Sequence, residues 1–238
     1  MKAAESLSEA EGALVEELAA HYLANQNLVS MFMKSMLGYI DESRELKKFA
    51  HSIRSRMKDP DHLRDKLQRK MIAAKRDGKD FDINKDNLFV RINDLAGIRI
   101  LHLHTTQIEQ INKAIKAIID EQGIELKEGP SARTWDDEYR SYFKDVGIDT
   151  QTSENLYTSV HYVIASKSRT TVTCEIQVRT LMEEVWGEVD HTINYPHKTT
   201  SVPCREQIRA LARQTSSATR LVDAIFATVD DIEKSKRA

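Results

Sequence analysis

Two adjacent runs of alternating residues constrain the fold of this chain more than any other feature. Residues 156–164 and residues 171–179 each alternate apolar and polar side chains, and a period of two is typical of strands that bury one face. The segment between them contains the turn-like sequence of residues 166–169. We therefore expect the two runs to pair as an antiparallel hairpin.

The polar residues of both runs share one face of this expected hairpin. They are Tyr157, Ser159, His161, Glu175, Gln177 and Arg179. A solvated face is the ordinary explanation for such a row in an antiparallel sheet. A carboxylate, an imidazole, a phenol and a guanidinium together also offer a metal ligand or base, phosphate donors and a stacking surface. Composition alone leaves both interpretations open.

Helical periodicity surrounds the hairpin. The first 75 residues repeat apolar positions at helical spacing, so strands are expected only after them. The polar residues 76–87 predict a surface loop. Four further elements are expected before the hairpin: a strand at 98–104, a helix at 107–121, a short strand at 123–126 completing a β–α–β unit, and a partly helical insertion at 128–154. The expected class is thus α/β (α+β), with a mixed sheet flanked by helices.

Two helices are expected after the hairpin. The first carries an apolar stripe of Met182, Val185, Trp186, Val189 and Ile193 and ends near Pro196. The last runs from about residue 203 to residue 232, and its apolar residues are Ile208, Leu211, Leu221, Val222, Ile225 and Val229. This helix either covers its own sheet or meets a partner, so a homo-oligomer is one expectation.

Net charge, cysteine content and the length of apolar stretches indicate where in the cell the protein is expected. The formal net charge of −2 gives no global basic field, so contacts to phosphates must come from local clusters. Two cysteines, Cys174 and Cys204, are too few for a disulfide scaffold. The apolar residues 28–40 are too short to span a bilayer, and no export signal precedes them. A cytoplasmic protein without a membrane partner is expected.

Four short motifs follow one another between residues 55 and 191. They are Ser55-Arg-Met-Lys-Asp-Pro60 with Lys66, Asn93-Asp-Leu-Ala-Gly-Ile-Arg99, Tyr157-Thr-Ser-Val-His161, and Glu175-Ile-Gln-Val-Arg-Thr180 followed by Trp186 and Asp190-His191. Each alone is a weak signal. Together and in this order, they resemble the synthetase domain of the RelA/SpoT alarmone enzymes, which make ppGpp and pppGpp, and in particular the small single-domain synthetases.

The resemblance implies a nucleotidyltransferase-like synthetase fold and a division of the chain. The expected parts are an N-terminal helical extension (1–50), the synthetase domain (51–200) and a C-terminal helix (201–238). It also implies an activity, the transfer of the β,γ-pyrophosphate of ATP to the 3′-hydroxyl of GTP or GDP. Mg²⁺ would be the cofactor and ATP the co-substrate, since such a transfer must hold a highly charged donor in line with the hydroxyl.

The resemblance assigns the donor side to six residues. Asp94 matches a magnesium-binding aspartate, and Glu175 matches a second acid that acts as base, metal ligand or both. The cations are Arg56 and Arg99, which match arginines on either side of the adenine, and Lys58 and Lys66, which match lysines on the donor phosphates.

The acceptor side rests on Tyr157, which matches a residue that stacks on the acceptor base, and on His161, which matches a phosphate contact. Gln177 and Arg179 would complete the polar floor. The chain departs from the family at Leu156 and Thr158, where glycine and a basic residue are common. A guanosine nucleotide, the 3′ end of tRNA and an adenosine nucleotide therefore all remain open as acceptors.

Other classes of function are less consistent with the sequence. The His-Asp metal ligands of the hydrolase in longer family members have no counterpart, and no P-loop motif is present. His102 and His104 share one strand face but lack a third ligand nearby, which favours a structural role. A catalytically inactive nucleotide sensor remains an alternative, although a pure binder would need neither Asp94 nor Glu175.

Overall fold

A six-stranded mixed sheet forms the centre of the computed structural model, which describes residues 7–153, 156–195 and 198–237. The strands are β1 (Ser52–Met57), β2 (Ala96–His102), β3 (Glu125–Thr134), β4 (Asp149–Thr152), β5 (Ser159–Ala165) and β6 (Thr173–Thr180). Their order is β1-β2-β6-β5-β3-β4. The β2–β6 and β3–β4 pairs are parallel, and the other pairs are antiparallel. The predicted α/β (α+β) class with a mixed sheet is confirmed.

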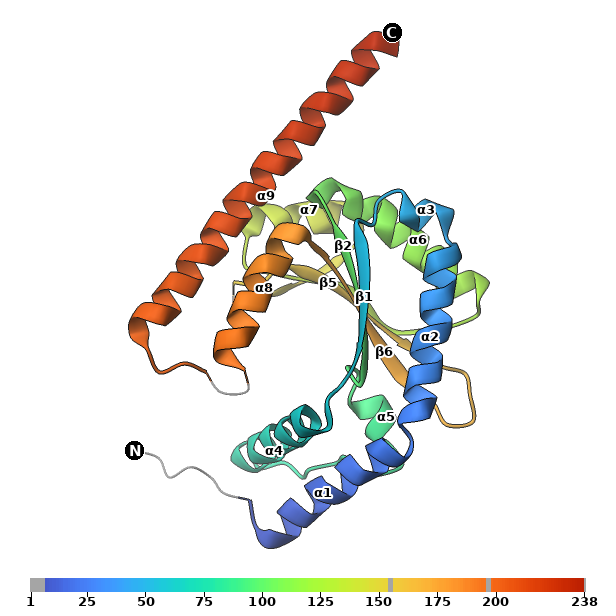
Figure 1. Ribbon diagram of the computed structural model, residues 1–238, viewed down its shortest axis with the longest axis vertical. Coiled ribbons are helices and arrows are strands. Elements are labelled where there is room, and N and C mark those ends of the chain that lie inside the picture. Colours follow the sequence, from blue (N-terminus) through green and yellow to red (C-terminus); the bar gives the residue numbers. More distant parts are fainter. Residues whose placement is uncertain (1–6, 154–155, 196–197, 238) are drawn as a thin grey trace.

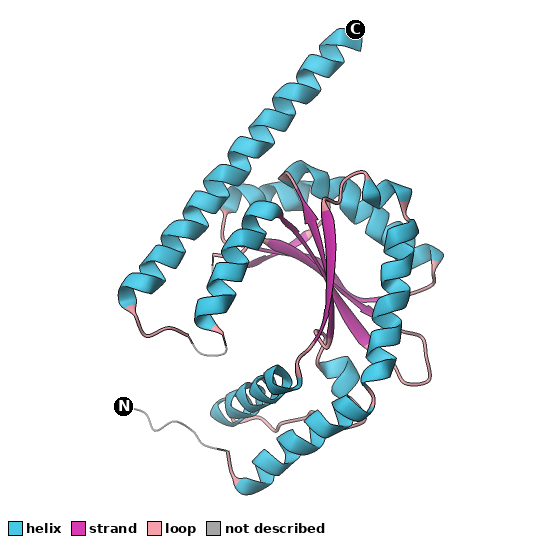
Figure 2. Ribbon diagram, viewed as in Figure 1, coloured by secondary structure: helices cyan, strands magenta, loops and turns pink. Residues whose placement is uncertain are grey.

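Helices cover the sheet and extend beyond it at both ends of the chain (Figures 1 and 2). They are α1 (Glu9–Ala24), α2 (Gln26–Glu42), α3 (Arg44–Lys47), α4 (Pro60–Arg76), α5 (Leu88–Arg91), the 3₁₀ turn η1 (Thr105–Gln107), α6 (Ile108–Glu121), α7 (Asp137–Asp145), α8 (Leu181–Asn194) and α9 (Val202–Arg237). Helices α2 and α6 lie against one face of the sheet, and α8 lies on the other side. None of the helices within the described residues is both long and apolar enough to cross a membrane.

The N-terminal helices share the main hydrophobic core with the sheet. Leu18 of α1 and Met36 and Ile40 of α2 are fully buried, in the same cluster as Ile98 of β2 and Tyr162 of β5. Burial of large aliphatic side chains supplies most of the driving force for such packing. The helices of the expected extension therefore form one wall of the core on which the sheet rests.

The expected hairpin forms as predicted. β5 and β6 pair antiparallel with His161 opposite Gln177 and Val163 opposite Glu175. Their apolar residues enter the core, and the polar residues lie on the opposite face of the sheet. This register brings the side chains of the two polar rows into cross-strand contact.

The expectation that strands begin only after residue 75 was wrong. β1 lies at Ser52–Met57 and pairs along its whole length with β2. Ile53 and Met57 are partly buried against the core, while Arg54 and Arg56 are exposed. A strand this short, with one partner, leaves only a weak alternating pattern between two helical segments.

The segment 128–154 is partly helical as expected, but it also contributes two strands to the sheet. β3 begins at Glu125 and continues to Thr134, and β4 and α7 follow it. The Gly129-Pro130 pair interrupts the strand pattern where the β3–β5 register shifts. Gly129 has a φ of +89°, and a side chain there would come within 2.4 Å of the His161 carbonyl oxygen. Only glycine fits this approach, so the turn signal marks an irregular strand and not a loop.

In the last two helices, several residues of the predicted apolar stripes are exposed. In α8 the buried residues are Glu183, Glu184 and Trp186, whereas Met182, Val185 and Ile193 are exposed. In α9 the first half packs on α8, and the second half extends away from the sheet (Figure 1). That half leaves Leu221, Ile225, Val229 and Ile232 exposed. The predicted helix end at Pro196 lies outside the described residues, and α8 ends at Asn194.

The shared core makes a prediction for helix α2. Ile40→Ala, at a fully buried position, should lower the free energy of unfolding by about 2–5 kcal/mol because it leaves a cavity. Met31→Ala, on the same helix but 65% exposed, should change it by less than about 0.5 kcal/mol. Urea unfolding followed by circular dichroism measures both. Equal, small losses for the two variants would show that the N-terminal helices do not share the core.

Candidate functional site

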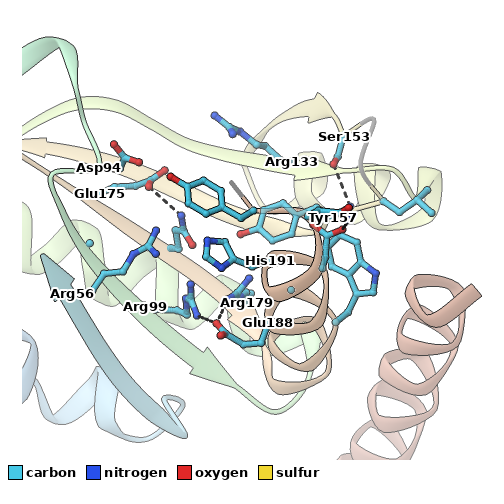
Figure 3. Close-up of a pocket in the computed structure, with 18 of the residues that line it drawn as sticks. Arg56, Asp94, Arg99, Arg133, Ser153, Tyr157, Glu175, Arg179, Glu188 and His191 are labelled. Atoms are coloured by element: carbon cyan, nitrogen blue, oxygen red, sulfur yellow. Dashed lines mark hydrogen bonds and ion pairs between the residues drawn. The ribbon is translucent and has the colours of Figure 1, made fainter. Parts of the chain in front are cut away.

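A cavity of about 710 Å³ opens on the polar face of the sheet, between β1, β2 and β6 on one side and α8 and the start of α9 on the other. Seven of the residues predicted from the motifs line it: Arg56, Asp94, Arg99, Tyr157, Glu175, Gln177 and Arg179 (Figure 3). Lys58, Lys66 and His161 lie directly behind these residues and bond to them. The sequence motifs therefore converge on one site.

Asp94 is held by two lysines at one end of the cavity. Lys58 Nζ lies 2.9 Å from one carboxylate oxygen, and Lys66 Nζ lies 2.7 Å from the other. Burial acts to raise the pKa of Asp94, but the two ammonium groups outweigh it and lower this pKa to about 2. Asp94 is therefore ionised at neutral pH, beside two cations able to bind phosphate oxygens.

Glu175 receives one hydrogen bond on each carboxylate oxygen. His161 Nδ1 lies 2.8 Å from Oε1, and Gln177 Nε2 donates to Oε2 across 3.0 Å. Burial acts to raise the pKa of Glu175, the bond from His161 opposes it, and the net pKa lies below its ordinary value. The carboxylate is therefore ionised and held in one orientation.

Two ionised carboxylates in one cavity are ligands of the type that Mg²⁺ binds in proteins. Asp94 and Glu175 lie side by side in the cavity (Figure 3). Among the described residues, no group of three or more His, Cys, Asp or Glu side chains is arranged to hold a metal. Mg²⁺ is commonly bound through only one or two carboxylates, with waters and substrate phosphates as its other ligands. The pair fits that type of site.

Arginines and glutamates form a network across the floor of the cavity. Arg99 Nη1 lies 2.7 Å from Glu184 and 2.6 Å from Glu188. Arg179, only 5% exposed, also pairs with Glu184. A side chain at Gly187 would approach the Arg179 guanidinium to 2.6 Å, so glycine leaves room for it. Helix α8 is thus tied to β2 and β6 by buried charges.

Tyr157 stands at the other end of the cavity, in front of β5. Its ring lies 6.1 Å from that of Trp186, and the Arg179 guanidinium lies over it at 5.7 Å. The preceding Leu156 has a φ of +55°, a left-handed conformation that glycine adopts without cost. Leu156 was expected on the core side of the hairpin, but it lines the cavity instead. The chain keeps the turn that presents Tyr157 without the usual glycine.

Sequence reasoning missed several residues of the cavity wall. Arg133 of β3, Lys198, and Arg205 and Arg209 of α9 all line it. Arg205 and Arg209 are four residues apart and so share one helix face. That spacing was the available signal. None of the four motifs contains these residues, so the motifs could not predict them.

An aromatic contact links α8 to α4 at the edge of the site. The ring of Tyr195 stacks on His191 at 4.6 Å and meets His62 of α4 edge-on at 4.7 Å. Arg69 of α4 also lies over the Tyr195 ring, at 5.6 Å. His191 and Tyr195 both line the cavity.

A protein-family model described as "Region found in RelA / SpoT proteins" matches residues 55–200, more than half of the chain. The chain belongs to this family. The match spans all four motifs, so the resemblance read from them is confirmed. No curated protein matches the chain.

Solved structures share the fold at low sequence identity. A GTP pyrophosphokinase family protein from Streptococcus pneumoniae is 18% identical, with a TM-score of 0.59 over 92% of this chain and 95% of that one. Small alarmone synthetase 1 from Bacillus subtilis, bound to its product pppGpp, is 17% identical, with a TM-score of 0.51 over 90% and 97%. The same protein bound to AMPCPP is 15% identical, with a TM-score of 0.52 over 91% and 97%. The expected synthetase fold is thereby confirmed.

Glu183, which does not line the cavity, makes the stability of the fold sensitive to pH. It is 4% exposed, and its carboxylate accepts the Thr158 N–H at 3.3 Å. Burial raises the pKa of Glu183 to about 7 from 4.5, against the lowering effects of that bond and of Arg179. Between these values the folded chain keeps a proton that the unfolded chain loses, so the contribution of Glu183 to stability falls as pH rises.

Glu183→Gln should remove this dependence because glutamine stays neutral. The variant should be more stable than the wild type by about 1–3 kcal/mol at about pH 8, and the advantage should vanish at about pH 4, below the ordinary pKa of the carboxyl. Urea unfolding of both proteins across this pH range measures the difference. A gain that is the same at every pH would contradict the assignment.

Proposed function

We propose that this chain is a GTP/GDP pyrophosphokinase that transfers the β,γ-pyrophosphate of ATP to the 3′-hydroxyl of a guanosine di- or triphosphate. The observation that carries the proposal is the pairing of Asp94 and Glu175 in one cavity, with Lys58 and Lys66 against Asp94. Two ionised carboxylates beside several cations suit a reaction that aligns a polyphosphate with a hydroxyl. Family membership supports the same class of reaction.

On the donor side, Arg56 and Arg99 hold the adenine between their planar guanidinium groups. Arg56 has no ion pair among the described residues, whereas Arg99 already bonds to Glu184 and Glu188, which fix its plane. Lys58 and Lys66 turn from Asp94 to the donor phosphates. Bound Mg²⁺ would neutralise phosphate charge, and Asp94 and Glu175 would be its protein ligands.

In the transfer step, the acceptor O3′ forms a bond to the β-phosphorus, and the bond from that phosphorus to the bridging oxygen of AMP breaks. The electron pair of the broken bond stays on AMP. Glu175 takes the hydroxyl proton and releases it to solvent. The carboxylate can accept this proton because it is ionised before the step.

On the acceptor side, Tyr157 stacks on the base, an interaction of about 1–3 kcal/mol in comparable contacts. Gln177 and Arg179 form the floor beneath it. Arg133, Arg205 and Arg209 supply the phosphate-binding cations that the sequence around Tyr157 lacks. Their position inside one cavity favours a free nucleotide over the 3′ end of tRNA. The solved complexes of small alarmone synthetase 1 with pppGpp and AMPCPP support nucleotides on both sides.

The test offers ATP labelled in the γ-phosphate and Mg²⁺ to the purified protein, with GDP, GTP, ATP and tRNA as separate acceptors. Label should move to GDP or GTP together with release of AMP. Glu175→Gln should reduce the rate by about 10²- to 10⁴-fold because it removes the base. Label on no acceptor would refute the transferase function, and label on tRNA or ATP alone would refute the guanosine acceptor.

The cations of α9 make a separate prediction. Arg205→Ala combined with Arg209→Ala should raise KM for GDP and GTP by roughly 10-fold or more, the value of a lost charged hydrogen bond, and leave KM for ATP unchanged. Arg213→Ala, on the same helix but outside the cavity, is the matched control. An unchanged KM for GDP would exclude α9 from the acceptor site.

A further inference from the structure

Three segments that are far apart in sequence supply the acceptor side of the cavity. Arg133 lies on β3, Tyr157 lies in the segment before β5, and Arg205 and Arg209 lie on α9. Close to these residues in sequence is a set of buried polar side chains that do not line the cavity. They are Thr134, Asp136, Thr158 and Ser216. These four residues form one polar cluster.

Asp136 is the centre of the polar cluster. Its Oδ1 accepts the backbone N–H groups of Glu138 and Tyr139 at 3.0 and 3.3 Å, which caps helix α7. Its Oδ2 accepts the Ser216 hydroxyl at 3.1 Å and Arg220 Nη2 at 2.5 Å, both from α9. One carboxylate oxygen therefore binds α7, and the other binds α9.

Hydrogen bonds also lead from Asp136 to the segment that carries Tyr157. The backbone N–H of Asp136 donates to Thr134 Oγ1 at 3.2 Å, and the hydroxyls of Thr134 and Thr158 lie 3.1 Å apart. Thr134 directly follows Arg133, and Thr158 directly follows Tyr157. The polar cluster is therefore bonded next to two acceptor-side residues.

Helix α9 runs past α8 and then past α7 (Figure 1), and it is attached to both. Near its start, the Ile208 carbonyl oxygen accepts the Nε1–H of Trp186 from α8 at 3.1 Å. The bonds to Asp136 lie about two to three turns further along the helix. One attachment alone would leave the direction of the helix open. Two separated attachments set it, and with it the positions of Arg205 and Arg209 in the cavity wall.

Asp136 is ionised in this setting. Burial acts to raise the pKa of its carboxyl, but Arg220 and the backbone donors of α7 outweigh this effect, and the net pKa lies below its ordinary value. A buried carboxylate is tolerated when its oxygens are hydrogen-bonded and a cation is paired with it. Arg220 therefore binds a full negative charge.

A separate contact holds α9 to the turn after β2. Asp223 accepts the backbone N–H of Thr105 at 2.6 Å. Neither of these residues is bonded to an acceptor-side segment, so this contact is left intact in the experiment below. It keeps α9 attached when the bonds to Asp136 are removed.

We propose that Asp136 is a positioning residue for the acceptor side of the cavity, holding β3, the segment of Tyr157 and α9 in one arrangement. Binding groups keep their geometry when hydrogen bonds behind them lock their supports. The inference rests on the proposed function, in which these segments bind the guanosine nucleotide. Among the described residues, no hydrogen bond or ion pair joins the polar cluster to Arg56, Lys58 or Lys66 on the donor side. Loss of the cluster should therefore weaken acceptor binding alone.

Three variants and one control test this role. Asp136→Asn keeps an oxygen for the α7 cap, since asparagine and aspartate cap helices about equally well, but it loses the charge that Arg220 binds. Arg220→Gln removes the same ion pair from the other side, and Arg220→Lys keeps the positive charge. Ser217→Ala is the matched control, because this serine is exposed and its hydroxyl donates to the Arg213 carbonyl oxygen of the same helix.

The readouts are Tm and the Kd values for GDP and for the ATP analogue AMPCPP, each with Mg²⁺, from isothermal titration calorimetry. Asp136→Asn and Arg220→Gln should raise the Kd for GDP by roughly 10-fold, about the value of one charged hydrogen bond. The Kd for AMPCPP should stay within about twofold of the wild type. Arg220→Lys should recover part of the loss, and Ser217→Ala should match the wild type.

Two results for the variants would overturn the inference. Kd values that rise equally for both nucleotides, with a lower Tm, would make Asp136 only structural. An unchanged Kd for GDP in both Asp136→Asn and Arg220→Gln would separate Asp136 from the acceptor side. A wild-type protein that binds GDP but transfers no label would refute the proposed function alone, whereas one that binds no GDP would refute both.

Discussion

The parallel pairing of β2 with β6 is the constraint on which the candidate site depends. It sets Gly97 opposite Glu175, and Asp94 lies three residues before Gly97, at the entrance to β2. Two carboxylates that are 81 residues apart in sequence are thereby brought side by side. A slip of one residue in this register would turn Glu175 toward the hydrophobic core. The site therefore assembles only when β2 and β6 pair in this register.

Ion pairs between buried and partly buried side chains are the second feature on which the site depends. The lysines bond to Asp94, and the arginines of the floor bond to glutamates of α8. Burying such charges is tolerable because each has a partner. Under the proposed function, nucleotide binding exchanges ionic partners within the cavity, and the differences between old and new contacts determine affinity. Fixed arginines keep their geometry, while the lysines on flexible stems can turn.

The sequence revealed the elements whose signals are local. Alternation between residues 156 and 179 predicted the hairpin, and the four motifs predicted ten site residues, seven of which line one cavity. Contacts between segments that are far apart in the sequence could not be predicted. The strand at Ser52–Met57 depends on pairing with β2, and the closeness of Arg205 and Arg209 to Tyr157 depends on how α9 packs. The partner of His161 depends on register, which a single sequence leaves unspecified.

Helix α9 combines a cationic first half and an exposed apolar second half in one continuous helix. Its first half places Arg205 and Arg209 in the cavity wall, and its second half carries the exposed apolar row that includes Ile225 and Ile232. An α-helix of 36 residues extends about 54 Å at roughly 1.5 Å per residue. Because an α-helix is stiff over this length, the exposed apolar row and the two arginines are held at a fixed separation along one element.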